Sequence, residues 1–82
     1  MSNLPAIEER LRAFVGSELV PAGTELEPET DLVGLVDSAA MVELIVWIET
    51  EYGFDIELDD LTPEVFGTIR KISEYVATRA QA

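Results

Sequence analysis

The sequence contains neither cysteine nor histidine. Without cysteine, the chain can form no disulfide framework and no thiolate metal site. Without histidine, it lacks the commonest metal ligand, the usual general base and the Ser-His or Cys-His pairs of nucleophilic enzymes. An enzyme would have to work with carboxylates alone, and no other feature of the chain indicates one. We therefore expect a protein that is not a catalyst.

Basic residues are also few, because five lysines and arginines stand against 17 acidic residues and give a net charge of −12. This charge repels nucleic acid and anionic membranes, and it attracts basic protein partners by long-range steering. Hydrophobic residues make up 48% of the 82 residues, which is too many for a disordered acidic tail. We therefore expect a single folded domain over residues 1–82, monomeric, with basic protein partners and no nucleic acid.

Long apolar runs are absent too. The longest unbroken one, residues 44–48, is far too short to span a bilayer. The first five residues show no basic region followed by an apolar core, so they indicate no signal peptide. These observations predict a cytoplasmic protein without membrane insertion.

A first helix is expected over residues 4–15, where apolar residues recur at helical spacing. Asn3 stands where a capping residue belongs, and Gly16 is expected to end the helix. Glu8 and Arg12 are four residues apart, which favours an ion pair on the exposed side.

A long crossover over residues 17–37 follows this helix. Pro21, Gly23 and Pro28 interrupt any regular structure in it. Its many apolar residues nevertheless predict an ordered segment that packs across the ends of the helices. A helical turn is expected at residues 30–33.

The strongest predicted helix covers residues 38–52, and Gly53 follows it as a C-cap. Its core face is predicted to consist of Met41, Leu44, Ile45, Ile48 and Tyr52. The opposite side carries more apolar area than a free surface ordinarily shows, namely Ala39, Ala40, Val46 and Trp47. This side is predicted to lie under the crossover or to contact a partner, and for Trp47 both interpretations stay open.

The rest of the chain predicts two further helices. A loop of alternating acidic and apolar residues leads to a short helix that starts at Thr62 and runs through Phe66. Thr68 then caps a last helix whose inward residues are Ile69, Ile72, Tyr75 and Val76. The fold class is therefore all-α, a bundle of three main helices and one short helix with no strand.

Residues 55–60 have the acidic spacing of an opening calcium-binding loop. Asp60 stands at the sixth position, where glycine is needed, and Phe66 stands at the twelfth, where a bidentate glutamate is needed. A solvated acidic loop explains the segment better, so we predict no metal site.

An Asp-Ser pair, Asp37 and Ser38, stands at the start of the second helix. Taken alone, such a pair is a signature of helix capping. Asp37 can cap the helix itself, which leaves Ser38 in the first turn with its hydroxyl exposed. Free amides and the helix dipole at this position favour an anion such as a phosphodiester.

Residues 34–56, GLVDSAAMVELIVWIETEYGFDI, resemble the core motif of the acyl and peptidyl carrier protein family. That motif contains the Asp-Ser pair, a Val-Glu-Leu run four residues later, an acidic pair and a glycine turn with Phe or Tyr. The resemblance spans nearly the whole chain and implies a four-helix bundle of carrier-protein type, a single thiolation domain. It further implies that Ser38 accepts 4′-phosphopantetheine from coenzyme A through a phosphopantetheinyl transferase. The thiol of this arm would hold cargo as a thioester.

The resemblance also implies where partner enzymes bind. The recognition positions carried over from the family are Ala39, Glu43, Val46 and Glu49 on the second helix, with Phe66 and Thr68 from the short-helix region. Ala40 and Trp47 join them as members of the outward apolar side. The implied partners are an adenylating ligase or acyltransferase and a downstream synthase or transferase with a basic docking surface.

The two residues that follow the serine differ from the usual pattern of the family. In the family, the residue after the serine is often Leu, Met or Phe, where this chain has Ala39. Fatty-acid carriers often have an acidic residue next, where this chain has Ala40. We therefore expect an aminoacyl or acyl carrier of polyketide or nonribosomal peptide type. Residues 32–38 and 62–68 also look like discrete amino-acid carriers, so a D-alanyl carrier for cell-envelope modification is an alternative. In a third interpretation, Ser38 is only a cap and the chain is a noncovalent acidic docking module.

Overall fold

The structure, a computed structural model, describes residues 3–79, and these residues contain four α-helices. Their bounds are α1 Leu4–Phe14, α2 Ser38–Tyr52, α3 Pro63–Phe66 and α4 Ile69–Arg79. A π-helix, η1 (Val15–Leu19), continues α1, and a 3-10 helix, η2 (Leu58–Asp60), precedes α3. No strand is present among these residues, so the predicted all-α fold with three main helices and one short helix is confirmed.

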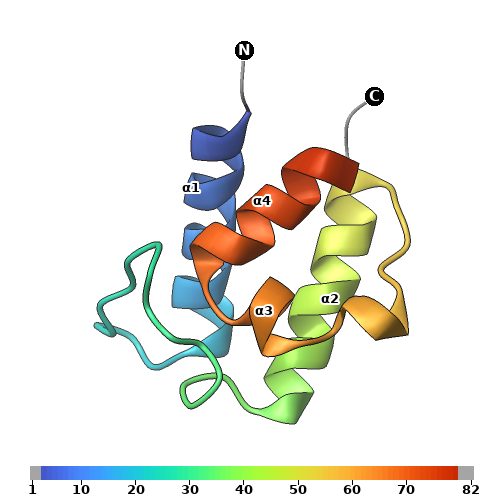
Figure 1. The fold of residues 1–82 in the computed structure, drawn as a ribbon. Helices are drawn as coiled ribbons and strands as arrows, with labels where there is room; N and C mark the ends of the chain where they lie inside the picture. Colours follow the sequence, from blue (N-terminus) through green and yellow to red (C-terminus); the bar gives the residue numbers. More distant parts are fainter. Residues whose placement is uncertain (1–2, 80–82) are drawn as a thin grey trace.

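The helix α2 begins at one end of the bundle and ends at the other (Figure 1). The first turn of α1 and the last turn of α4 are both at this second end. α1 packs against α4, and α3 packs against the start of α4. No helix in residues 3–79 has both the length and the apolar character that crossing a membrane requires.

The core is formed by residues from every helix and from the crossover. Helical residues buried in it are Ile7, Leu11, Val15, Leu44, Ile48, Phe66, Ile69, Ile72 and Val76. The crossover adds Val20, Leu32 and Val36. The predicted ordered crossover that packs across the helix ends is therefore confirmed.

Both predictions for the ends of α1 need correction. Asn3 occupies the N-cap position, but its side chain makes no capping hydrogen bond. Gly16 does not end the helix, because the chain continues through η1 to Leu19. A glycine ends a helix through a left-handed conformation, and among the described residues only Gly23 and Gly53 have positive φ angles. Gly53 is therefore the C-cap of α2, as predicted.

The turn predicted at residues 30–33 forms later in the crossover. The amide of Val36 donates to the carbonyl of Leu32 at 2.9 Å. Asp31 is extended instead of helical, because it forms an isolated antiparallel bridge with Thr68. This bridge fastens the crossover to the junction between α3 and α4.

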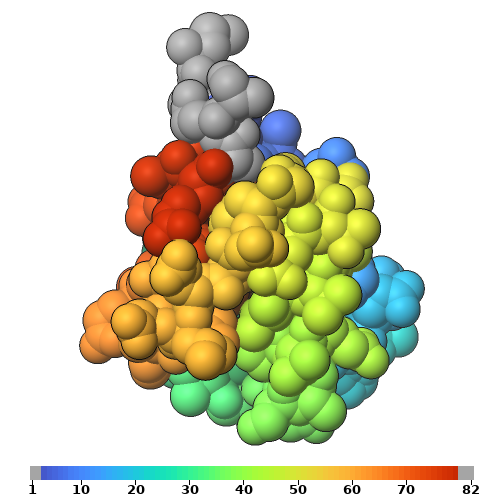
Figure 2. Space-filling view, turned by 90° about the vertical axis from the view of Figure 1, so that its right-hand side faces the viewer, coloured from blue at the N-terminus to red at the C-terminus, as the bar shows by residue number. Residues whose placement is uncertain are grey.

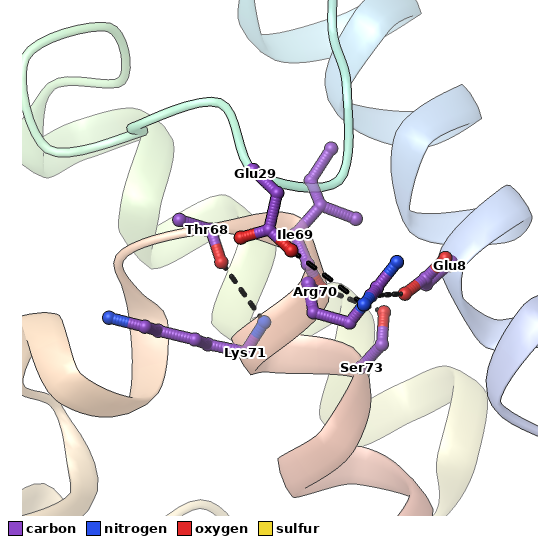
Figure 3. A network of polar contacts seen from close by, with 7 residues as sticks. All are labelled: Glu8, Glu29, Thr68, Ile69, Arg70, Lys71 and Ser73. Carbon is purple, nitrogen blue, oxygen red and sulfur yellow. Dashed lines mark hydrogen bonds and ion pairs between the residues drawn. The ribbon is translucent and has the colours of Figure 1, made fainter.

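Arg70 of α4 holds α1 and the crossover together (Figure 3). Its guanidinium forms an ion pair with Glu8 of α1 and a second one, at 3.6 Å, with Glu29 of the crossover. Glu8 therefore does not form the predicted pair with Arg12, which instead binds Glu9 at 2.7 Å. The pair between Glu8 and Arg70 joins two helices that are distant in the sequence, so the periodicity within one helix cannot predict it.

Candidate functional site

Ser38 is the first residue of α2, and it is exposed. Asp37 precedes it with an extended backbone, and its Oδ1 accepts a hydrogen bond from the amide of Ala40 at 2.8 Å. The carbonyl of Asp37 accepts a second one from Met41 at 2.9 Å. The predicted division is therefore confirmed, with Asp37 as the cap and Ser38 as an exposed residue of the first turn.

The backbone around Ser38 presents free hydrogen-bond donors. The amides of Ser38 and Ala39 make no hydrogen bond with any residue in 3–79, since the cap of Asp37 is directed to Ala40. The first amides of a helix and the positive end of its dipole stabilise an anion. The position next to the Ser38 hydroxyl is therefore favourable for a negatively charged group.

An apolar pocket of about 320 Å³ opens beside Ser38. It is formed by the start of α2, the turn before it and the segment that ends in α3. Its lining residues are Val33, Val36, Asp37, Ser38, Met41, Val42, Ile45, Leu61, Thr62, Pro63 and Phe66. A group attached to Ser38 therefore finds an apolar surface within reach.

The wall of the pocket opposite α2 depends on the tight turn of α3. The amide of Phe66 donates to the carbonyl of Thr62 at 2.7 Å. Gly67 follows in a helical conformation, and a Cβ at this position would clash with the carbonyl oxygen of Pro63. Only a glycine fits this close approach without a backbone shift. Phe66, predicted as a partner contact, is 4% exposed, so its ring belongs to the core and lines the pocket.

Two carboxylates fasten the loop between α2 and α3. The Oε2 atom of Glu49 accepts a hydrogen bond from the amide of Ile56 at 2.8 Å. Oδ2 of Asp60 accepts one from the hydroxyl of Tyr75 at 2.8 Å and another from Arg79 at 2.9 Å. Glu49, predicted as a recognition residue, is therefore already engaged within the protein.

Several large apolar side chains are exposed, most of them at this pocket. Among the described residues they are Val33 (58% exposed), Val42 (58%), Val46 (54%), Leu58 (84%) and Leu61 (37%). Three of them line the pocket, and Val46 lies one helical turn beyond Val42. Figure 2 shows α2, in green and yellow, beside the orange segment that contains η2 on this one face. We call these five residues the apolar face.

The predicted recognition residues of α2 separate into two sets. Ala39, Glu43 and Val46 are exposed, as expected of residues that contact a partner. Ala40 and Trp47 are half-buried against the core.

Trp47 lies on the side of α2 that faces α1. Its ring stacks on Phe14 with a centroid distance of 4.6 Å and an interplanar angle of 12°, and it meets the edge of Tyr52. The sequence predicts that Trp47 lies under the crossover or contacts a partner. Neither interpretation includes this contact with α1. Thr68 is half-buried, and its Oγ1 accepts a hydrogen bond from the amide of Lys71 at 3.1 Å (Figure 3). It therefore caps α4 as predicted.

Sequence reasoning missed four members of the apolar face, Val33, Val42, Leu58 and Leu61. Val42 could have been found, because it stands four residues before Val46 and so shares its stripe on the helix. Leu58 and Leu61 lie in an irregular loop, where no periodicity tells an exposed leucine from a buried one. Their exposure depends on how η2 is held against α4.

The sequence matches one family model over residues 9–76, described as the phosphopantetheine attachment site. A comparison with curated proteins finds no match.

The fold resembles those of several solved chains, including the following two. A chain in the crystal structure of Bradyrhizobium japonicum glycine:[carrier protein] ligase complexed with glycylated carrier protein is 23% identical, with a TM-score of 0.68. The alignment covers 89% of this protein and 96% of that chain. The Toxoplasma-specific mitochondrial acyl carrier protein is 18% identical, with a TM-score of 0.80. This alignment covers 98% of this protein and 94% of that chain.

These low identities establish a common fold, whereas the family model covers most of the chain. The family is generally not catalytic, and its cofactor is 4′-phosphopantetheine, which is attached covalently. The chain therefore belongs to the phosphopantetheine attachment site family and is a carrier protein of that type.

Proposed function

We propose that Ser38 is the residue that carries the phosphopantetheine arm, and that the loaded protein delivers an aminoacyl or acyl group to biosynthetic enzymes. The observation that carries the proposal is the position of Ser38. Its side chain is exposed in the first turn of α2, at the mouth of an apolar pocket of about 320 Å³. Asp37 caps the helix in its place.

The residues present at this position fit the arm. The phosphodiester would lie beside the free amides of Ser38 and Ala39, where the helix dipole stabilises its charge. Apolar portions of the arm or of its cargo would contact the pocket wall formed by Met41, Ile45 and Phe66. When bound, the group supplies a terminal thiol that holds the cargo as a thioester.

Attachment requires only a hydroxyl from this protein. The oxygen of Ser38 forms a new bond to the phosphorus next to the pantetheine of coenzyme A, and the bond from that phosphorus to 3′,5′-ADP breaks. The hydroxyl proton passes to a base of the transferase, and 3′,5′-ADP leaves. All catalytic groups come from the transferase, which agrees with a chain that has no cysteine and no histidine.

The charge of −12 supports basic partner enzymes, because opposite charges steer the encounter. Ala39, Glu43 and Val46 offer such an enzyme a mixed apolar and acidic stripe on α2. We propose this stripe as a docking surface for the enzymes that load and unload the arm.

An aminoacyl cargo is the more specific part of the proposal. One similar fold comes from a complex with a glycylated carrier protein, and its partner is a glycine:[carrier protein] ligase. The small residues Ala39 and Ala40 beside Ser38 also differ from the fatty-acid pattern. We therefore propose an amino acid loaded by a separate adenylating ligase, in a cytoplasmic pathway of specialised metabolism.

The attachment is tested by incubating the chain with coenzyme A and a broad-specificity phosphopantetheinyl transferase, followed by intact mass spectrometry. We expect the wild type and the control Ser17→Ala to gain one phosphopantetheinyl group, and Ser38→Ala to gain none. An unmodified wild type, or a modified Ser38→Ala variant, would refute the proposal. The unmodified wild type would favour a noncovalent docking module.

The cargo is tested on the holo protein recovered from the cells that produce it. Its intact mass is measured before and after hydroxylamine, which cleaves thioesters. A released mass equal to an aminoacyl group supports the proposal. A ladder of fatty-acyl masses contradicts the aminoacyl assignment and leaves the carrier role in place.

A further inference from the structure

Leu58 is the most exposed of the large hydrophobic residues in the described part of the chain, at 84%. It opens the short helix η2, between the exposed acidic residues Glu57 and Asp59. A single exposed leucine is common on protein surfaces and needs no explanation by itself. Three features of its surroundings distinguish this one.

The first feature is that the turn with Leu58 is held in place from both sides. Before it, the amide of Ile56 donates to Glu49 of α2 at 2.8 Å. After it, Asp60 binds the Tyr75 hydroxyl and the Arg79 guanidinium of α4. Leu58 is thus presented by a fixed turn, and a partner that binds it has little loop entropy to overcome.

The second feature is continuity with the pocket beside Ser38. The amide of Leu61 donates to the carbonyl of Leu58 at 3.1 Å, which closes one 3-10 turn. Residues three apart in such a turn lie on the same side. Because Leu61 lines the pocket and Leu58 lies on the same turn, Leu58 extends the apolar rim of the pocket beyond Leu61.

The third feature is the unbalanced charge around Leu58. The carboxylates of Glu57 and Asp59 form no ion pair within residues 3–79. The guanidinium of Arg79 forms its ion pair with the adjacent Asp60. A surface that covers Leu58 must therefore provide an apolar socket bordered by cations.

We propose that Leu58 is a docking anchor for the phosphopantetheinyl transferase that modifies Ser38. The transferase would present an apolar socket flanked by lysine or arginine, which takes up Leu58 while Glu57 and Asp59 meet the basic rim. A transferase that reaches the Ser38 hydroxyl covers the pocket mouth, and its footprint then continues over Leu61 to Leu58. This inference rests on the proposed function of Ser38.

Steady-state kinetics with coenzyme A and a broad-specificity phosphopantetheinyl transferase test the anchor. Leu58→Ser is expected to raise the KM for the carrier about tenfold and to leave kcat unchanged, since it removes binding that ground state and transition state share. Leu58→Met, which keeps the apolar contact, should stay within about twofold of the wild type. Ala13→Ser, an exposed α1 position outside the pocket, should behave like the wild type.

The outcomes separate this inference from the carrier assignment. A KM for Leu58→Ser equal to that of a normally modified wild type overturns the anchor and leaves Ser38 as the attachment site. A fall in kcat with unchanged KM overturns it as well. Failure to modify the wild type refutes the proposed function itself. A thermal melt by circular dichroism confirms that Leu58→Ser is folded, as its exposed position predicts.

Discussion

The hydroxyl of Tyr75 donates a hydrogen bond to the carboxylate of Asp60 across 2.8 Å. Arg79 binds the same carboxylate oxygen at 2.9 Å, and its guanidinium lies 5.0 Å from the centre of the Tyr75 ring. These contacts join η2 to the last two turns of α4. The orientation of Leu58 and of the pocket rim therefore depends on side chains at the far end of the sequence.

Tyr75→Phe should lower the free energy of unfolding by about 1 kcal/mol, the usual net contribution of one hydrogen bond. The ring contacts with Phe54 and Phe66 remain in this variant, so the change isolates the hydroxyl. Urea denaturation followed by circular dichroism measures the difference. A variant as stable as the wild type would mean that water replaces the Asp60 contact at no cost.

The protein should lose stability as the pH rises above about 10, the ordinary pKa of tyrosine. Burial raises the pKa of Tyr52 and the pKa of Tyr75. Between the unfolded and the folded pKa, the folded state binds more protons, so its stability falls with rising pH. The hydroxyl of Tyr52 is buried without a hydrogen-bond partner among the described residues. The melting temperature of Tyr52→Phe should therefore decline less steeply with rising pH than that of the wild type. An unchanged slope would mean that the Tyr52 hydroxyl is not a cause of the alkaline loss of stability.

Gly67→Ala should destabilise the fold by about 1–3 kcal/mol, because the new methyl group meets the carbonyl oxygen of Pro63 and forces the turn of α3 to shift. The matched control is Gly34→Ala. A Cβ at Gly34 has no atom within 4 Å, and its φ angle is not positive. Chemical denaturation of both variants tests the difference. Equal stabilities of the two variants would show that the turn of α3 shifts to accommodate the methyl group at little cost in free energy.

Asp37→Ala should lower the free energy of unfolding by about 1 kcal/mol, the typical contribution of an N-cap side chain. Asp37→Asn keeps an oxygen that can accept from the amide of Ala40, so it should retain most of the stability. The two variants are compared by urea denaturation. If Asp37→Asn lost as much as Asp37→Ala, charge and not capping would be the cause.

The sequence predicted the features that local rules control. Asp37 as a cap, Ser38 in an exposed first turn and Gly53 as a left-handed C-cap each follow from a few neighbouring residues. Thr68 as the cap of α4 follows in the same way. These features are sufficient to locate the candidate site.

The features that sequence reasoning missed depend on how the helices face one another. α2 is apolar on nearly all sides, so its periodicity could not separate the side toward α1 from the outward side. Helical spacing alone therefore places Trp47 on the outward apolar side, although its ring stacks on Phe14. Val15 is fully buried, and the π-helix η1 runs from it through Gly16, where a helix end was predicted.

The central claim is that Ser38, among all the hydroxyl-bearing residues, carries the arm. Fragmentation mass spectrometry of the holo wild type, prepared with coenzyme A and the transferase, tests this claim most directly. We predict that every fragment with the added phosphopantetheinyl mass contains Ser38, and that Ser17 and Ser73 are unmodified. A modified fragment without Ser38 would contradict the account.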